Sequence, residues 1–327
     1  MSRPIIEEFL TNLYRVEIPL PQNPLKATNS YMIKAGQKNL IIDTGMNRKE
    51  CMEAMSAALQ ELGVDLRHTD FFITHLHADH SGLVSELAAP SARVYFNKPD
   101  AAVLEQKNYW QELYLTALKY GFSESDLQNA IEKHPGNKYS PSRVVDLTLV
   151  QEGDTITIGG YNLQCVETPG HTRGHTCLYE PDRKLLISGD HILGDITPNI
   201  SSWDDSGDPL REYYRSLGKI YDMEVDLVLP GHRSIVTDCR RRIMELKEHH
   251  EKRLVEVRRI LADNGPSSAV QVASRMTWDI IAAGWDEFPL MQKWFATGEA
   301  IAHLRYLETE AKVQREFVDE TIIFMPV

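Results

Sequence analysis

The sequence predicts an α/β protein, in the wider α+β sense, with a smaller helical domain at its C-terminal end. Three observations predict this class. Up to about residue 240, short β-like runs alternate with helical segments, whereas residues 97–143 carry only helical patterns. Near residue 240 the pattern changes to long amphipathic helices. We therefore expect a main domain over residues 1–240, a helical insertion or cap over 97–143, and a C-terminal domain over 241–327.

Strand signals dominate the main domain. The runs "YRVEIPL", "NSYMIKAG" and "NLIIDTG" predict consecutive strands, because each is bounded by Pro, Asn or Gly. A helix is expected from about Arg48 to Leu62, with Gly63 as its C-cap glycine. The segment "DFFITHLH" predicts a buried strand. Further strands are expected in "ARVYFN", "DTITIGGYNLQCVETPG", "HTCLYEP", "KLLISGD" and "VDLVLPGH".

Helical spacing predicts the insertion and the C-terminal domain. In the insertion, "KPDAAVLEQKNYWQELYLTALKYGF" predicts one helix, and "SESDLQNAIEKH" opens a second with a capping-box-like pattern. After residue 240, "CRRRIMELKEHHEKRLVEVRRILADNG" predicts a long amphipathic helix that ends at Asn264 and Gly265. Two more helical segments and a terminal hairpin, "KVQREFVDETIIFMPV", follow. Three helices and a hairpin resemble a winged helix.

The bulk composition is that of an ordinary globular chain. Hydrophobic residues make up 42% of the 327 residues. The chain contains no run of about 18 apolar residues, the length needed to span a membrane. The start of the chain lacks a signal-peptide pattern, and the four cysteines form no C-x-x-C pair, so we expect a cytoplasmic protein. The net charge of −12 disfavours nucleic acid or an anionic membrane as partner, because both favour a basic surface.

The segment "THLHADHSG" concentrates residues that bind divalent metals. In an extended chain His75 and His77 point the same way, because side chains alternate with period two, so both can hold one ion. Asp79 shares that face if the chain stays extended. His80 turns away where a helix is expected to begin and can reach a second ion. The spacing therefore suits two metals better than one.

One loop cannot complete two coordination shells, so more ligands are expected at later strand ends. "TPGHTRGHT" offers His171 after a Pro-Gly turn, "ISGDHIL" offers Asp190, and "LPGHRSI" offers His232 after another Pro-Gly turn. Loops on a rigid scaffold can present such side chains to one rim. Histidine and aspartate without cysteine permit zinc, iron or manganese. We expect two divalent ions, with Zn²⁺ favoured.

These motifs resemble the metallo-β-lactamase superfamily, in its two-metal hydrolase branch of glyoxalase II-like and lactamase-β-like members. The family motif H-x-H-x-D-H matches residues 75–80, "IIDTG" matches its early strand-turn motif, and the resemblance covers about residues 10–240. It implies an αβ/βα sandwich and a catalytic role for the main domain. It also implies that His75, His77 and His171 hold the first metal, that Asp79, His80 and His232 hold the second, and that Asp190 bridges them.

Residues beside the ligands are expected to support them. By resemblance Asp43 sits beneath the metals and orients a ligand histidine, a role that carboxylates often take, although a plain turn role is the alternative. His191 lies next to Asp190, and His175 lies in the same turn as His171. Both are assigned supporting or packing roles.

The ligand set predicts hydrolysis. Two divalent ions about 3.5–4 Å apart lower the pKa of a bridging water toward about 7, so that hydroxide forms at neutral pH and attacks the substrate. No G-x-S-x-G motif offers a serine nucleophile instead. Asp79 is the candidate catalytic residue, placed to hydrogen-bond the nucleophile and to pass a proton to the leaving group.

The insertion bears on the substrate. The superfamily acts on thioesters, lactones, β-lactams and phosphodiesters, and one branch oxidises sulfur compounds with iron. An aromatic cap with Tyr109, Trp110 and Tyr114 favours a small molecule with an apolar part, such as an acyl thioester, an ester or a lactone. The alternative is that these aromatic residues only pack the helices of the insertion.

Two other activities stay open. The winged-helix-like domain suggests phosphodiesterase or endoribonuclease activity as an alternative. Its candidate recognition helix, "TGEAIAHLRYLETE", is acidic, however, and therefore poorly suited to contact the phosphate groups of a nucleic acid. We expect this domain to brace the rim of the site or to form a homodimer contact. A mononuclear iron sulfur dioxygenase is a further alternative, which the complete second ligand set disfavours.

Overall fold

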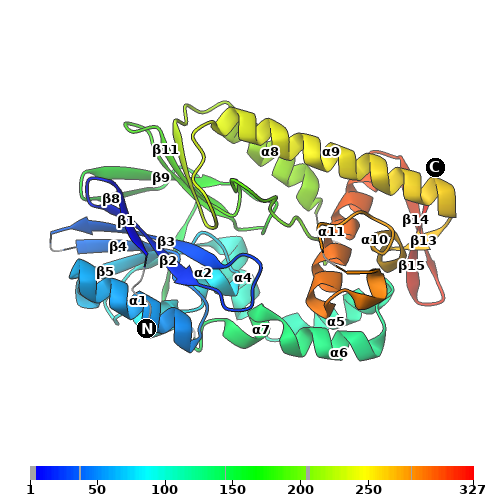
Figure 1. Ribbon diagram of the computed structural model, residues 1–327, viewed down its shortest axis with the longest axis horizontal. Coiled ribbons are helices and arrows are strands. Elements are labelled where there is room, and N and C mark those ends of the chain that lie inside the picture. The colour runs from blue at the N-terminus through cyan, green and yellow to red at the C-terminus, as the bar shows by residue number, and fades with distance from the viewer. Residues whose placement is uncertain (1–4, 37, 144, 204–206, 281) are drawn as a thin grey trace.

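The computed structural model describes residues 5–36, 38–143, 145–203, 207–280 and 282–327, and its architecture is a four-layer sandwich with a C-terminal domain (Figure 1). Two mixed β-sheets pack face to face, and helices cover their outer faces. The αβ/βα sandwich that the sequence predicts is thereby confirmed. None of the helices in these ranges combines the length and hydropathy that a bilayer crossing requires.

The first sheet has seven strands in sequence order, antiparallel from β1 to β4 and parallel from β4 to β7. The strand predicted in "DFFITHLH" ends earlier than expected, at Phe72, so the histidines that follow lie in a loop and a short helix. The strands are β1 (Ile6–Leu10), β2 (Leu13–Pro19), β3 (Ala27–Ala35), β4 (Lys38–Ile42), β5 (Thr69–Phe72), β6 (Val94–Asn97) and β7 (Leu147–Val150).

The second sheet has five strands in the order β12-β11-β10-β9-β8. Its β8–β9 hairpin turns at Gly159 and Gly160, whose positive φ angles of 58° and 80° are those of a two-residue turn that glycine favours. Only β11 and β12 pair in parallel here. The strands are β8 (Thr155–Ile158), β9 (Tyr161–Glu167), β10 (Thr176–Glu180), β11 (Leu185–Gly189) and β12 (Leu227–Pro230).

Apolar side chains form one core between the sheets and one on each outer face. On the first sheet α1 buries Cys51 and Met55, and it ends at Gly63, which has a φ of 64°. On the second sheet α8 and the long α9 cover the core. The helices outside the insertion are α1 (Lys49–Leu62), η1 (Leu66–His68), α2 (Ala78–Ser81), α3 (Val84–Leu87), α8 (Pro209–Tyr221), α9 (Cys239–Asn264), α10 (Ala269–Ala273), η2 (Trp285–Glu287) and α11 (Leu290–Thr309).

The insertion is helical, as predicted, but contains four helices where the sequence pattern suggests two. The first predicted helix breaks at Gln106, whose backbone is extended, because the polar run from Glu105 to Asn108 has no apolar face to bury. The insertion runs from the sandwich to the C-terminal domain (Figure 1). Its helices are α4 (Lys98–Glu105), α5 (Tyr109–Lys119), α6 (Glu124–Lys133) and α7 (Pro135–Tyr139).

The C-terminal domain contains the three helices and the hairpin that the sequence predicts. Its helix α9 reaches from the outer face of the second sheet to the far end of the molecule, so the predicted boundary at residue 240 falls at the start of a continuous helix (Figure 1). The domain packs on the insertion, and Tyr120 stacks on Phe324 with ring centroids 6.4 Å apart. Its strands are β13 (Ser267–Ser268), β14 (Val313–Val318) and β15 (Thr321–Pro326).

Candidate metal centre

The predicted ligands converge at one end of the two sheets. His75 and His77 follow β5, and Asp79 and His80 lie in α2, for which His77 is the N-cap residue. The other three come from single loops of the second sheet. His171 follows β9, Asp190 follows β11, and His232 follows β12.

Three histidines form what we call the first cluster: His75, His77 and His171. His77 Nδ1 lies 3.0 Å from His75 Nε2 and 3.0 Å from His171 Nε2. His75 and His77 thus approach one point, but they do so through different ring nitrogens and from a loop. In an extended strand the two side chains would point the same way, and alternation alone does not predict that they use different nitrogens.

The second cluster consists of Asp79, His80 and His232. His232 Nε2 lies 3.3 Å from Asp79 Oδ2 and 3.3 Å from His80 Nε2. Asp190 lies between the clusters, because its Oδ2 is 3.4 Å from His232 Nε2 and 3.6 Å from His171 Nε2. The seven side chains therefore form two groups that share one carboxylate, the arrangement that the resemblance implies.

Four of the five rings are held through Nδ1, which leaves Nε2 facing the cluster. In each case an oxygen accepts the Nδ1 proton, so in the neutral ring Nε2 carries the lone pair, the form that binds a metal. Thr74 Oγ1 is an acceptor here because its own proton goes to Asp43 Oδ2, 2.8 Å away. The acceptors are Thr74 Oγ1 for His75 (3.0 Å), Asp43 Oδ2 for His80 (2.8 Å), the Asn199 carbonyl for His171 (2.8 Å) and the Ala27 carbonyl for His232 (2.8 Å).

The contacts among these rings fit bound cations. A lone pair cannot donate a hydrogen bond, so the His80–His232 contact between two Nε2 atoms is not one. His77 can donate to only one of its two neighbours. In addition, Asp190 Oδ1 is buried and makes no hydrogen bond within the described chain. Buried nitrogen and carboxylate ligands without protons between them match a divalent metal site.

Asp43 makes the contact that the resemblance implies. Its Oδ1 accepts from the Thr74 backbone N–H at 2.9 Å, and its Oδ2 accepts from His80 Nδ1. The residue has a φ of 59°, a left-handed conformation that costs energy for a residue with a Cβ and often occurs at functional sites. Its carboxylate is buried directly behind His80.

Burial and charge divide the two clusters. Burial lowers the pKa of His75 and His171, and it lowers that of His77 to about 3, so these rings are neutral at pH 7. Burial acts in the same direction on His80 and His232, but neighbouring carboxylates outweigh it. They raise the pKa of His80 and bring that of His232 to about 10. Without metal the second cluster therefore holds protons.

Two supporting residues carry weaker sequence signals. His175 Nε2 accepts the backbone N–H of Asp190 at 3.1 Å, so it positions the shared carboxylate. Asp100 is fully buried and accepts from the backbone N–H groups of Leu76 at 2.9 Å and Gly174 at 2.6 Å. It thus ties together the two loops of the first cluster. The sequence signal that could have identified Asp100 is an acidic residue just after the predicted strand "ARVYFN".

Of the supporting and packing roles expected for His191, the structure shows packing. No hydrogen bond joins either ring nitrogen to any described residue. Its ring instead packs against Tyr213, with centroids 5.2 Å apart, and the Tyr213 hydroxyl donates to the His191 carbonyl at 2.9 Å. The chain turns after Asp190, so the next side chain points into the core of the second sheet rather than toward the ligands.

A hydrogen-bonded relay joins the first cluster to the C-terminal domain. The Asn199 carbonyl accepts from His171, and the Asn199 side-chain amide donates to Glu299 Oε2 at 3.2 Å. Glu299 Oε1 lies 3.3 Å from Arg253 Nε, and both residues are buried. Glu299 is on α11 and Arg253 on α9. Nothing in the local sequence around Asn199 indicates this role, because both partners are distant in the chain.

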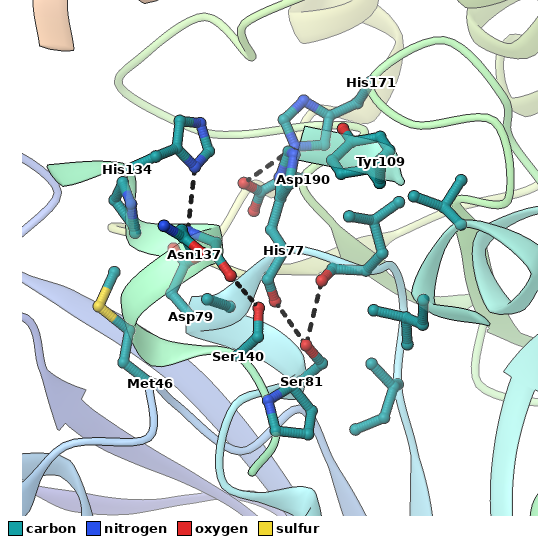
Figure 2. A pocket seen from close by; sticks show the side chains of 18 of the residues that line it. Met46, His77, Asp79, Ser81, Tyr109, His134, Asn137, Ser140, His171 and Asp190 are labelled. Carbon is teal, nitrogen blue, oxygen red and sulfur yellow. Dashed lines mark hydrogen bonds and ion pairs between the residues drawn. The ribbon is translucent and has the colours of Figure 1, made fainter. Parts of the chain in front are cut away.

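A cavity of about 730 Å³ opens from the metal centre, and His77, Asp79, His171 and Asp190 line one part of it (Figure 2). This volume is typical of small-molecule sites. Gly231 allows the walls to approach closely, since a Cβ there would lie 2.6 Å from Asp190 Oδ1.

The insertion contributes Tyr109, Trp110 and Leu113 to this cavity, but Tyr114 is not among the described residues that line it. The expected cap role is therefore wrong for Tyr114. At about 100° per residue, Tyr114 falls outside the arc of α5 that the three lining residues span. It packs instead against the apolar cluster that joins the insertion to the C-terminal domain.

His134, between α6 and α7, also lines the cavity. Its Nδ1 accepts the backbone N–H of Gly136 at 3.1 Å, so the proton lies on Nε2. Burial lowers its pKa to about 4, which keeps the ring neutral. Aromatic rings of Trp110, Trp294 and Phe295 surround it, with centroids 4.9 to 5.9 Å away.

The fold and the paired clusters define a metallo-hydrolase of the sandwich type, and comparisons with known proteins agree. The family model "Metallo-beta-lactamase superfamily" matches residues 23–232, and the model "Metallo-beta-lactamase-like, C-terminal domain" matches residues 261–327. The chain therefore belongs to the metallo-β-lactamase superfamily.

Individual relatives extend this likeness along the chain. A metallo-β-lactamase family protein of Thermus thermophilus has a solved structure with a TM-score of 0.82 and 25% identity, covering 98% of this chain and 100% of its own. The probable metallo-hydrolase YqjP of Bacillus subtilis is 27% identical over 90% of this chain and 92% of its own length.

Two relatives of Emericella nidulans match less of their own length. The lactamase-like protein aptB is 25% identical over 73% of this chain, and the chain spans 62% of that protein. An atrochrysone carboxyl ACP thioesterase is 26% identical over 71% of this chain, and the chain spans 59% of it.

Proposed function

We propose that this protein is a metal-dependent hydrolase of small molecules with a thioester, ester or lactone bond, acting with two divalent ions, in the first instance Zn²⁺. The observation that carries the proposal is the pair of ligand clusters with one shared carboxylate, Asp190, at the wall of a cavity lined mainly by apolar side chains. The thioesterase name of one relative supports the substrate class.

The ligand side chains would divide the two ions between them. His75, His77 and His171 would hold one ion, and Asp79, His80 and His232 the other, with Asp190 shared. When bound, two such ions lower the pKa of water and polarise the bond that is cleaved. Water adds across the acyl bond, and the products are a carboxylic acid and a thiol or alcohol.

Asp79 is the candidate for proton transfer. Its side chain is 13% exposed, lines the cavity, and lies 3.3 Å from His232 Nε2. Its Oδ2 faces the second cluster, so the other carboxylate oxygen, Oδ1, would accept a proton from the attacking water and return it to the leaving atom. In an Asp79→Asn variant that keeps its metals, kcat should fall by about 10²–10⁴-fold, the usual contribution of such a group. An unchanged kcat at full metal content would remove this role from Asp79.

The cavity argues against a nucleic-acid substrate. Arg143 is the single arginine or lysine among the described residues that line it, whereas Asp79, Glu105 and Asp190 are acidic. The α11 segment expected as a recognition helix is largely buried, including Glu299 and Arg305, so it is not free to enter a groove. Both features disfavour contact with a phosphate backbone.

A substrate screen tests the proposal. Metal-quantified protein is assayed with acyl-CoA thioesters, lactones, bis-p-nitrophenyl phosphate and short RNA. We expect turnover of thioesters or lactones with about two ions per chain. Activity on the last two substrates alone would favour the phosphodiesterase alternative, and a single iron with thiol oxidation would favour the dioxygenase.

A further inference from the structure

Several apolar residues that line the cavity lie together on the outer face of the first sheet. Val94 and Phe96 are two residues apart on β6 and share a face, and Leu147 on β7 pairs with Val94. Helix α4 packs against both strands. We call this part of the cavity the apolar arm and define it by six lining residues: Val84, Val94, Phe96, Ala101, Leu104 and Leu147.

The apolar arm is deep and has one more exposed end. Val94 and Phe96 are each 1% exposed, and Ala101 is 4% exposed, whereas Leu104 is 39% exposed. The arm is continuous with the metal centre, because Leu76 lines the same cavity and directly precedes His77. A molecule that reaches the ligands can therefore extend along the sheet beneath α4.

The lining of the arm selects its occupant. The six side chains carry no polar atom, so a phosphate or sugar would lose its hydrogen bonds to water without replacement. The affinity for a hydrocarbon chain increases about fourfold for each methylene group that binding removes from water. The small side chain of Ala101 leaves room on the face of α4 that lies over β6 and β7.

We infer that the apolar arm holds the acyl chain of the substrate, so that the enzyme prefers long linear acyl groups over acetyl groups. The inference rests on the proposed function for the bond that is cleaved, but the binding of the chain does not depend on it. The carbonyl would lie at the metal centre and the methylenes beneath α4. Water would add to the carbonyl carbon, the acyl–sulfur bond would break, and the thiol would leave with a proton.

A chain-length series on paired variants tests the inference. Wild-type protein, Ala101→Phe and Ala102→Phe are assayed with acetyl to dodecanoyl thioesters of CoA, with metal content and melting temperature measured. Ala102 is the exposed neighbour of Ala101 on α4, so it controls for the added ring. In wild type we expect kcat/KM to rise about fourfold per methylene that enters the arm. Ala101→Phe should remove that rise, and Ala102→Phe should behave as wild type.

A binding measurement keeps the test independent of turnover and of a poorly folded variant. Acetate and decanoate share a carboxylate, so their affinity ratio by calorimetry on metal-loaded protein reports the chain alone. We expect a ratio of at least about 100 in wild type and a smaller ratio in the milder Ala101→Val. A flat chain-length profile with active enzyme, or a ratio near one, overturns the inference. A high ratio without any acyl turnover would leave the arm in place and reject the proposed function instead.

Discussion

The two ligand clusters differ in how the chain supports and charges them. In the first cluster, His75 and His171 are held by neutral oxygens of Thr74 and Asn199, and all three rings are neutral. In the second cluster, carboxylates surround His80 and His232 and raise their pKa values. The two clusters thus bind a cation differently, although their ligands are of similar type. The first cluster releases no proton when a cation binds, whereas the second must release protons to bind one.

Asp190 lies within reach of histidines from both clusters, so its removal should have the largest effect. We expect the Asp190→Ala variant to lose metal from both clusters. Its activity should fall by more than about 100-fold, which is the largest loss usual for residues that only support a ligand. Elemental analysis and turnover measure this. Asp195→Ala, an exposed acid five residues on, is the matched control. Wild-type metal content in Asp190→Ala would contradict the sharing.

The pH dependence of metal loading should separate the clusters next. His232 has a pKa raised to about 10, so below that pH the metal-free second cluster carries a proton that the ion must displace. Its affinity should fall about tenfold per pH unit for each displaced proton as the pH decreases from 9 to 6. The first cluster should not change there, because the His77 pKa is about 3. Chelator-competition titrations measure both steps, and equal slopes would refute the difference.

Asp43 supports only the second cluster directly. Asp43→Asn weakens the charge on the acceptor of His80 Nδ1 and should reduce metal affinity at that cluster by ~10–100-fold. The first cluster should change less, through Thr74 alone. Two-step calorimetric titration resolves the sites. Asp70→Asn, whose carboxylate pairs with Arg93 away from the ligands, is the control. An equal loss at both clusters would show that Asp43 acts on the whole site.

The smallest effect is expected from the relay to the C-terminal domain. Glu299→Gln keeps the size of the side chain but weakens its hold on Asn199 and hence on His171. We expect the affinity of the first cluster to fall about tenfold, the lower end for supporting residues, with the second cluster unchanged. Glu308→Gln on the same helix, which pairs with Arg305 and Arg315, is the control. Identical titrations of the two variants would remove Glu299 from the relay.

Local residue types and spacing were sufficient to predict which seven side chains the structure brings together. Four competent residues within residues 75–80, and single His or Asp residues after Pro-Gly or Ser-Gly turns, mark loops that a sheet presents at one end. The same patterns predicted the helical insertion and most of the strands of the two large sheets, but they missed β1 and β7. They did not predict that β5 ends at Phe72 or that His77 uses Nδ1, because the ring nitrogen that faces an ion depends on backbone direction in an irregular loop.

The sequence by itself determined the class of fold, the seven ligand candidates and the chemistry that such ligands support, because periodicity and residue type act locally. Only the tertiary structure decided which residues hold those ligands and what shape the substrate meets. Asn199, Glu299 and Arg253 are joined over distances of 46 to 100 residues in the chain. Tyr114 turns away from the cavity while Ala101 lines it, since packing against other elements sets the direction of each side chain.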